Sequence, residues 1–282
     1  MGSHEIGVFL RCVGADDPAE ALALVRDRLG LDLVQLSKLP DEYYTDEGAR
    51  RVERMLGDAG VRAQSVVIVH DGESYADMAA VRQTVGYVPE ETMAPRVEYS
   101  RLCVDLAAAL GVEIVTTHIG VAPSDESDPV YSRLLEAVGR VGVYGRMHGI
   151  MLALETGQES ARELVDFMDR LPGIPLGVNF DPGNYAIYDS DDALAAVKLL
   201  RERIVGVHVK DGVPPDRPGA LGKEARPGEG KARLGECLRY LAETGYEGAY
   251  IIENYVARGG TVDEKLGELE RAKRFTEEAL TL

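Results

Sequence analysis

The chain has 282 residues, a net charge of −17 at pH 7 and an apolar content of 45%. Binding of a polyphosphate backbone requires a basic surface, so this acidity argues against nucleic acid as a partner. No run of 18 or more apolar residues is present, so we expect no membrane partner. The length is compatible with one large barrel or with two ordinary domains.

The N-terminus lacks the basic and apolar regions of a secretory signal, and residues 1–4 look like a remnant of a cloning tag. The cysteines, Cys12, Cys103 and Cys237, are widely spaced and odd in number. This pattern favours reduced, buried thiols over disulfides. These features together predict a cytoplasmic protein.

Short apolar runs alternate with longer amphipathic segments along the whole chain. The apolar runs predict strands at 6–12, 33–38, 62–70, 113–119, 150–155, 176–181, 204–209 and 249–253. The amphipathic segments predict helices at 18–29, 46–59, 93–110, 129–148, 159–170, 190–202, 235–244 and 262–279. Eight such units favour a single-domain α/β fold, a (β/α)₈ TIM barrel over residues 1–282, with an open doubly wound sheet as the alternative.

Four of the predicted strands end in a side chain that commonly binds metal ions: Glu155, Asp181, His208 and Glu253. A parallel barrel directs the C-terminal ends of its strands to one face, so these side chains can converge. Their mostly oxygen donors suit Mn²⁺, or Mg²⁺ or Co²⁺, with one ion per chain. A lone carboxylate at a strand end is more often a salt-bridge partner, but a buried cluster of carboxylates requires a neutralising cation.

Two histidines occupy similar positions. His70 ends the third predicted strand and His118 ends the fourth. Their placement at the ligand face predicts a proton carrier or a contact with a substrate hydroxyl. The alternative for each is a core histidine whose nitrogens are hydrogen bonded.

Asn184 and Lys210 follow two of the predicted ligands. A Pro-Gly turn should hold Asn184 close to Asp181, where it would contact substrate or bound water, unless it only caps the loop. Lys210 lies two residues after His208 and should share its inward face. It would neutralise an enediolate or phosphate oxygen; the alternative is a solvated lysine at the barrel rim.

Two segments are too long for simple turns, residues 71–92 and residues 210–234. They follow the third and seventh predicted strands, so both would lie at the ligand face. Long loops there usually form lids or specificity walls. We expect their side chains to select the substrate, among them Tyr75, Arg82, Tyr87 and Arg217.

Six motifs together resemble the xylose isomerase-like TIM barrel superfamily, the sugar phosphate isomerase/epimerase group. They are THIG around His118, LALETG around Glu155, NFDPGN around Asp181, VHVKDG around His208, PGEGKARL, and GYEGAYIIEN around Glu253. The resemblance implies a (β/α)₈ barrel that binds one divalent cation, often Mn²⁺, through Glu155, Asp181, His208 and Glu253. It also implies a small polyol or keto-sugar substrate, and a homo-oligomer, because such barrels are commonly dimers or tetramers.

The resemblance to the epimerase branch further implies that Glu155 and Glu253 act as acid and base on opposite faces of the substrate carbon. One glutamate would remove a proton next to a carbonyl, through a metal-stabilised enediolate. The other glutamate, or His118, would deliver a proton. The predicted function is therefore a sugar isomerase or epimerase.

The chain departs from the epimerase motif at Asn184, where many members have a histidine. The VHVKD motif is more similar to inosose dehydratases and keto-glycoside lyases, which eliminate water or an aglycone after the same proton abstraction. A lyase is therefore the second hypothesis, and a non-catalytic barrel subunit is the third. Type IV apurinic endonucleases share the barrel, and His70 and His118 match two of their ligand positions. The sequence lacks their additional histidines and basic groove.

Overall fold

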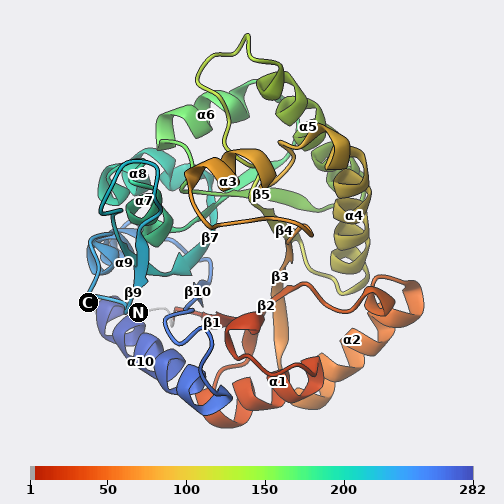
Figure 1. Cartoon of the computed structure of the whole chain (residues 1–282). Coiled ribbons are helices and arrows are strands. Elements are labelled where there is room, and N and C mark those ends of the chain that lie inside the picture. Colours follow the sequence, from red (N-terminus) through yellow and green to blue (C-terminus); the bar gives the residue numbers. More distant parts are fainter. Residues whose placement is uncertain (1–3, 282) are drawn as a thin grey trace.

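A computed structural model describes residues 4–281 of the chain (Figure 1). Within them, parallel strands close into a barrel in the order β1–β10–β7–β6–β5–β4–β3–β2. These strands are β1 (Ile6–Phe9), β2 (Leu33–Ser37), β3 (Arg62–Ile68), β4 (Ile114–Thr117), β5 (Met151–Glu155), β6 (Leu176–Phe180), β7 (Ile204–Val209) and β10 (Tyr250–Ile252). The predicted (β/α)₈ barrel is confirmed, and the open doubly wound alternative is wrong.

Helices surround the barrel (Figure 1). They are α1 (Pro18–Leu24), α2 (Asp46–Ala59), α3 (Met78–Thr84), α4 (Glu90–Ala109), α5 (Pro129–Met147), α6 (Ala161–Asp169), α7 (Pro182–Tyr188), α8 (Ala193–Leu200), α9 (Leu234–Glu243) and α10 (Val262–Leu280). Short 3₁₀ or π-helical segments are η1 (Leu10–Cys12), η2 (Val25–Leu29), η3 (Asp41–Tyr43) and η4 (Arg201–Arg203). Across residues 4–281, we find no helix with the length and apolarity needed to cross a membrane.

The barrel strands are buried over almost their whole length. In β5 only Met151 is half-buried, and in β7 only Val205 is half-buried, while the other residues of both strands are buried. Helices cover the outer face of a parallel barrel and side chains fill its interior, so both faces of each strand are buried and mostly apolar. Two-sided burial therefore explains the continuous apolar runs of the sequence.

The two long connections contain elements that the sequence pattern does not predict. Residues 71–92 include α3 and the start of α4, which begins at Glu90 rather than at position 93. Residues 210–234 include an antiparallel hairpin of β8 (Asp211–Val213) and β9 (Lys223–Ala225). The backbone N–H of Met78 donates to the carbonyl oxygen of Gly219 at 3.1 Å, which joins the two connections.

The segment that follows β6 is a helix, where the sequence suggests a tight turn. Pro182 is the first residue of α7, a position where proline sacrifices no backbone hydrogen bond. Asp181 caps this helix, because its Oδ1 accepts a hydrogen bond from the backbone N–H of Asn184 at 2.9 Å. The Asp-Pro-Gly-Asn motif is thus a helix start that fixes the orientation of the Asp181 carboxylate.

Candidate active site

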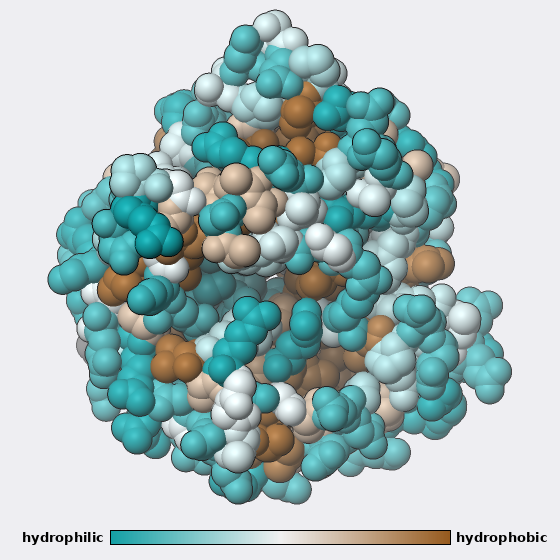
Figure 2. All heavy atoms as spheres, viewed as in Figure 1, coloured by the Kyte–Doolittle hydropathy of each residue, from teal (hydrophilic) through white to brown (hydrophobic). Residues whose placement is uncertain are grey.

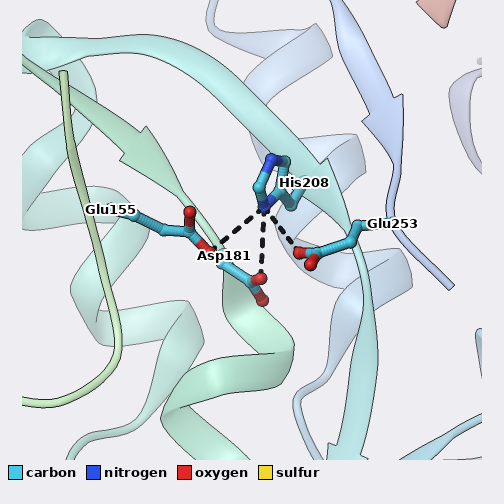
Figure 3. Close-up of side chains that lie close together, drawn as sticks. All are labelled: Glu155, Asp181, His208 and Glu253. Carbon is cyan, nitrogen blue, oxygen red and sulfur yellow. Dashed lines mark hydrogen bonds and ion pairs between the residues drawn. The ribbon is translucent and has the colours of Figure 1, made fainter. Parts of the chain in front are cut away.

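The four predicted metal ligands meet at the C-terminal end of the barrel. Glu155 is the last residue of β5, His208 lies near the end of β7, and Asp181 and Glu253 directly follow β6 and β10. One donor atom from each side chain lies within 4.8 Å of the donor atoms of the others. Figure 3 shows the three carboxylates pointing at one ring nitrogen of His208.

That nitrogen, Nδ1 of His208, lies 2.9 Å from Glu253 Oε2, 3.3 Å from Asp181 Oδ2 and 3.4 Å from Glu155 Oε1. Asp181 and His208 are fully buried, and Glu155 and Glu253 are only 7% and 8% exposed. A ring nitrogen carries at most one hydrogen, so it cannot satisfy three carboxylates at once. The cluster therefore needs a further source of positive charge.

Lys210 supplies part of that charge. Its Nζ lies 3.1 Å from Glu253 Oε2 and 3.4 Å from Asp181 Oδ2. Burial would raise the pKa of Glu253, but Lys210 and His208 lower that pKa to about 2. With His208 neutral, as a metal-binding imidazole must be, three carboxylates and one ammonium group leave two negative charges, which one divalent cation would neutralise. The charge and the oxygen-rich donors therefore fit a divalent cation such as Mn²⁺ or Mg²⁺.

Side chains in the barrel interior contact the other ring nitrogen of His208. His208 Nε2 lies 2.8 Å from Gln35 Oε1 and 3.1 Å from Asn179 Nδ2. A hydrogen on Nε2, donated to the Gln35 oxygen, would leave a lone pair on Nδ1, as a metal-binding nitrogen requires. Asn179 Nδ2 is itself a donor, so in this tautomer it contacts Nε2 without a hydrogen bond. The sequence interpretation missed both partners. The available signal was a polar residue inside an otherwise apolar strand, as in LVQLS and LGVNF.

His118 and Asn184 both contact Glu155. His118 Nε2 lies 3.1 Å from Glu155 Oε1, and Asn184 Nδ2 donates to the same oxygen at 3.2 Å. Burial lowers the pKa of His118, but the Glu155 carboxylate more than offsets this and the pKa is raised. Gly157 allows Asn184 to approach, because a Cβ at Gly157 would lie 2.2 Å from that of Asn184. The structure thus brings both residues to the predicted metal site.

A cavity of about 570 Å³ lies at this end of the barrel, within the usual size range for small-molecule sites. Figure 2 shows the molecular face hollowed at its centre. The predicted site residues that line the cavity are Glu155, Glu253, His118, Asn184 and Lys210. The fully buried Asp181 and His208 do not line it. Of the four predicted ligands, the two glutamates can therefore touch a bound molecule.

His70 does not line this cavity. Its ring packs against Tyr87 and Tyr99, with ring centroids 5.0 Å and 6.1 Å apart, and it lines a separate cavity beside α4. Burial, with Arg96 nearby, lowers the pKa of His70 to about 3, so its ring is neutral. Its predicted contact with substrate gains no support from this position.

The two long connections both contribute to the cavity wall, through Glu73 and Tyr75 from one and Leu221, Gly222 and Glu224 from the other. Tyr75 is therefore placed as expected for a residue that selects substrate. Tyr87 is fully buried, with its hydroxyl 2.8 Å from Ser100 Oγ, so its expected role in substrate selection gains no support from this position. Arg82 and Arg217 are exposed and do not line the cavity.

The comparison with known proteins identifies the family. A profile of xylose isomerase-like TIM barrels matches residues 22–278. The chain belongs to the xylose isomerase-like TIM barrel family. This xylose isomerase-like barrel is 30% identical to a xylose isomerase domain protein from Planctomyces limnophilus, with 99% of this chain and 98% of that chain covered and a TM-score of 0.87. The family resemblance inferred from the motifs is thus confirmed.

More distant barrels share the fold of this family member. A xylose isomerase-like TIM barrel protein from Mycobacterium smegmatis in complex with magnesium is 19% identical, with 99% and 98% of the two chains covered and a TM-score of 0.72. An L-ribulose 3-epimerase is 18% identical, with 99% and 95% covered and a TM-score of 0.72. At these identities the similarity establishes the architecture alone.

Proposed function

We propose that this xylose isomerase-like barrel is a divalent-metal-dependent isomerase or epimerase of a small sugar or keto sugar. The proposal depends chiefly on one observation: Glu155 and Glu253 belong to the metal-ligand cluster and also line the cavity. A carboxylate in that position can exchange a proton with the carbon next to a substrate carbonyl. The named L-ribulose 3-epimerase among the structural neighbours supports the substrate class.

Glu155, Asp181, His208 and Glu253 would hold one cation per chain, for which we propose Mn²⁺, Mg²⁺ or Co²⁺. When bound, such a cation would supply Lewis-acid stabilisation of the charge on the enediolate. Asp181 and His208 lie outside the cavity wall, so their proposed role is confined to holding the cation.

Glu253 is the proposed base. Its pKa of about 2 keeps it ionised at neutral pH, and the Lys210 ammonium 3.1 Å away stabilises that charge. Glu155 is the proposed group that delivers a proton back to the substrate carbon. His118, whose pKa is raised, lies 3.1 Å from Glu155 Oε1 and would donate the proton through it. The proton removed from carbon thus goes to Glu253, and a second proton reaches carbon from the Glu155–His118 pair.

Elimination from a 3-keto sugar or inosose is the second candidate, and Asn184 favours it. The Asn184 amide donates to Glu155 Oε1 and to the Thr156 carbonyl, each at 3.2 Å. Many epimerases have at this position a histidine that helps to hold the substrate, and Asn184 does not replace it. After the same proton abstraction, the substrate would then expel a β-oxygen instead of regaining a proton at carbon.

Incubation of the manganese-loaded protein with ketoses and 3-keto sugars in D₂O tests both candidates. Deuterium next to the carbonyl of an intact sugar supports isomerisation, and an unsaturated or aglycone-free product supports elimination. Glu155→Gln should abolish either reaction. Glu113→Gln is the matched control, because Glu113 is exposed and precedes β4 at the other end of the barrel. A metal-loaded protein that catalyses no exchange with any of these sugars would instead support the non-catalytic barrel.

We also propose a reducing, cytoplasmic location. Cys12, Cys103 and Cys237 are buried and form no disulfide with one another, which fits such a compartment. Assembly into a dimer or tetramer stays a prediction from the family resemblance.

A further inference from the structure

Three basic side chains, Arg11, Arg258 and Lys265, line the cavity. Arg11 lies in η1 directly after β1, Arg258 lies in the connection after β10, and Lys265 is in the first turns of α10. Strands β1 and β10 pair with each other in the barrel, so these segments are neighbours. The cluster stands out because the chain has only 31 Lys and Arg against 48 Asp and Glu.

None of the three basic groups has a carboxylate partner within 4.0 Å among residues 4–281. Two carboxylates outside the metal cluster also line the cavity, but both accept hydrogen bonds from the protein. Glu224 accepts from the backbone N–H of Tyr255 at 2.6 Å, and Glu73 accepts from the backbone N–H of Gly86 at 2.9 Å. The positive charge at the β1–β10 side is therefore available to a bound molecule.

The side chain of Lys265 packs against Gly14. A Cβ at Gly14 would lie 2.4 Å from both Cδ and Nζ of Lys265. Gly14 also has a φ of +78°, which favours glycine. The half-buried lysine thus packs against the backbone that follows β1, and it also lines the cavity. It is less free than a lysine on an open helix surface.

We propose that the substrate carries an anionic group, a carboxylate or a phosphate, which Arg11, Arg258 and Lys265 bind. This inference rests on the proposed function, in which the cavity holds the carbonyl end of the substrate at the metal cluster. A guanidinium group presents paired N–H donors that match the oxygens of either anion. The substrate class is therefore a keto-sugar acid or a keto-sugar phosphate, whose anion would pair with these cations in the cavity.

Calorimetric titration of the manganese-loaded protein with matched sugars tests the proposal. The pairs are D-ribulose with D-ribulose 5-phosphate, and D-tagatose with D-tagaturonate, so that phosphate and carboxylate are examined separately. At least one anionic sugar should bind about tenfold more tightly than its neutral partner, as expected for hydrogen bonds to charged groups. The preference should weaken as salt is added. Equal affinities within both pairs would overturn the proposal.

Variants establish whether the basic cluster causes the preference. The double variant Arg11→Gln/Arg258→Gln should lose it and keep its affinity for the neutral ketose, and Lys265→Gln should lose part of it. Arg54→Gln is the control, because Arg54 is an exposed arginine of α2 that does not line the cavity. A preference that survives in the double variant would show that the anion binds elsewhere, at the metal cluster for example, and would overturn the proposal.

Deuterium exchange separates failure of this inference from failure of the proposed function. Exchange into neutral ketoses without any preference for anionic sugars would leave the proposed function intact and overturn the anion site. A preference that depends on Arg11 and Arg258, without exchange into any sugar, would support the anion site and contradict the proposed reaction.

Discussion

His208 Nε2 lies 2.8 Å from Gln35 Oε1, a contact between β7 and β2 that crosses the interior of the barrel. Two strands, β10 and β1, separate β7 from β2 around the barrel wall. Gln35 Oε1 can accept a hydrogen from Nε2, while Nδ1 faces the three carboxylates. Gln35 therefore contacts and orients a candidate metal ligand that is far from it in the sequence.

Gln35→Leu should weaken Mn²⁺ binding by about 10- to 100-fold, the usual cost of losing a hydrogen-bond partner of a metal ligand. Competition with a chelator of known affinity measures the change. Gln35→Glu should retain most of the affinity, because a carboxylate accepts the same hydrogen bond. Equal affinities for the wild type and Gln35→Leu would show that Gln35 does not set the tautomer.

Gly157→Ala should destabilise the fold and displace Asn184. Gly157 has a φ of +134°, and an added Cβ would lie 2.2 Å from Asn184 Cβ. We expect a loss of at least about 1–3 kcal/mol in unfolding free energy, measured by urea denaturation. Gly57→Ala is the matched control, because nothing lies near its Cβ position in α2 and alanine there should stabilise by about 0.5–1 kcal/mol. Similar effects of the two substitutions would contradict the role of Gly157.

Because Glu159 is buried, we expect the free energy of unfolding to depend on pH. Burial raises the pKa of Glu159 from 4.5 to about 8, although His118 opposes the rise. Between these pH values the folded state binds more protons than the unfolded state, so the contribution of Glu159 to stability falls as pH rises. Glu159→Gln, which has no charge in either state, removes this loss.

Urea denaturation of both proteins at pH 5, 6.5 and 8 measures the effect. The variant should gain stability relative to the wild type as pH rises, by up to about 1.4 kcal/mol for each unit of pKa shift. A difference that stays constant from pH 5 to pH 8 would mean that Glu159 is ionised in the folded protein.

The sequence predicts the barrel well because burial on both faces gives each strand a continuous apolar run. Helix α2 has the predicted bounds, residues 46–59, since Thr45 caps its start and Gly60 ends it. Helices α3 and α7 are only 7 residues long, and β8 and β9 only 3 residues each, so none is long enough to establish a periodic pattern. Their formation depends on tertiary contacts, such as the one between Met78 and Gly219.

In the site, too, some residues could be predicted from a local pattern and others depend on tertiary contacts. Glu155, Asp181, His208 and Glu253 could be chosen from the sequence because each lies at the end of a barrel strand, and parallel strands bring their ends together. Which side chains then face the cavity depends on the connections. His70 also ends a strand run, yet it packs against Tyr87 and Tyr99 instead.

Some residues that belong to no sequence motif also line the cavity, namely Arg11, Arg258 and Lys265. Arg11 and Arg258 belong to segments that meet because β1 pairs with β10, the closing step of the barrel. Lys265 lines the same cavity from α10 and packs against Gly14. No local pattern reports such a contact, so only the folded arrangement brings the three together.

The metal content of the chain tests the assignment of the four ligands directly. After exposure to Mn²⁺ and removal of free ions, elemental analysis should find one Mn²⁺ per wild-type chain and none in Asp181→Asn or His208→Asn. Saturating Mn²⁺ should stabilise the wild type by about 2.7 kcal/mol at 100 times Kd, and should not stabilise either variant. A wild-type chain that retains no divalent ion, or variants that retain as much as the wild type, would contradict the assignment of these side chains to a metal site.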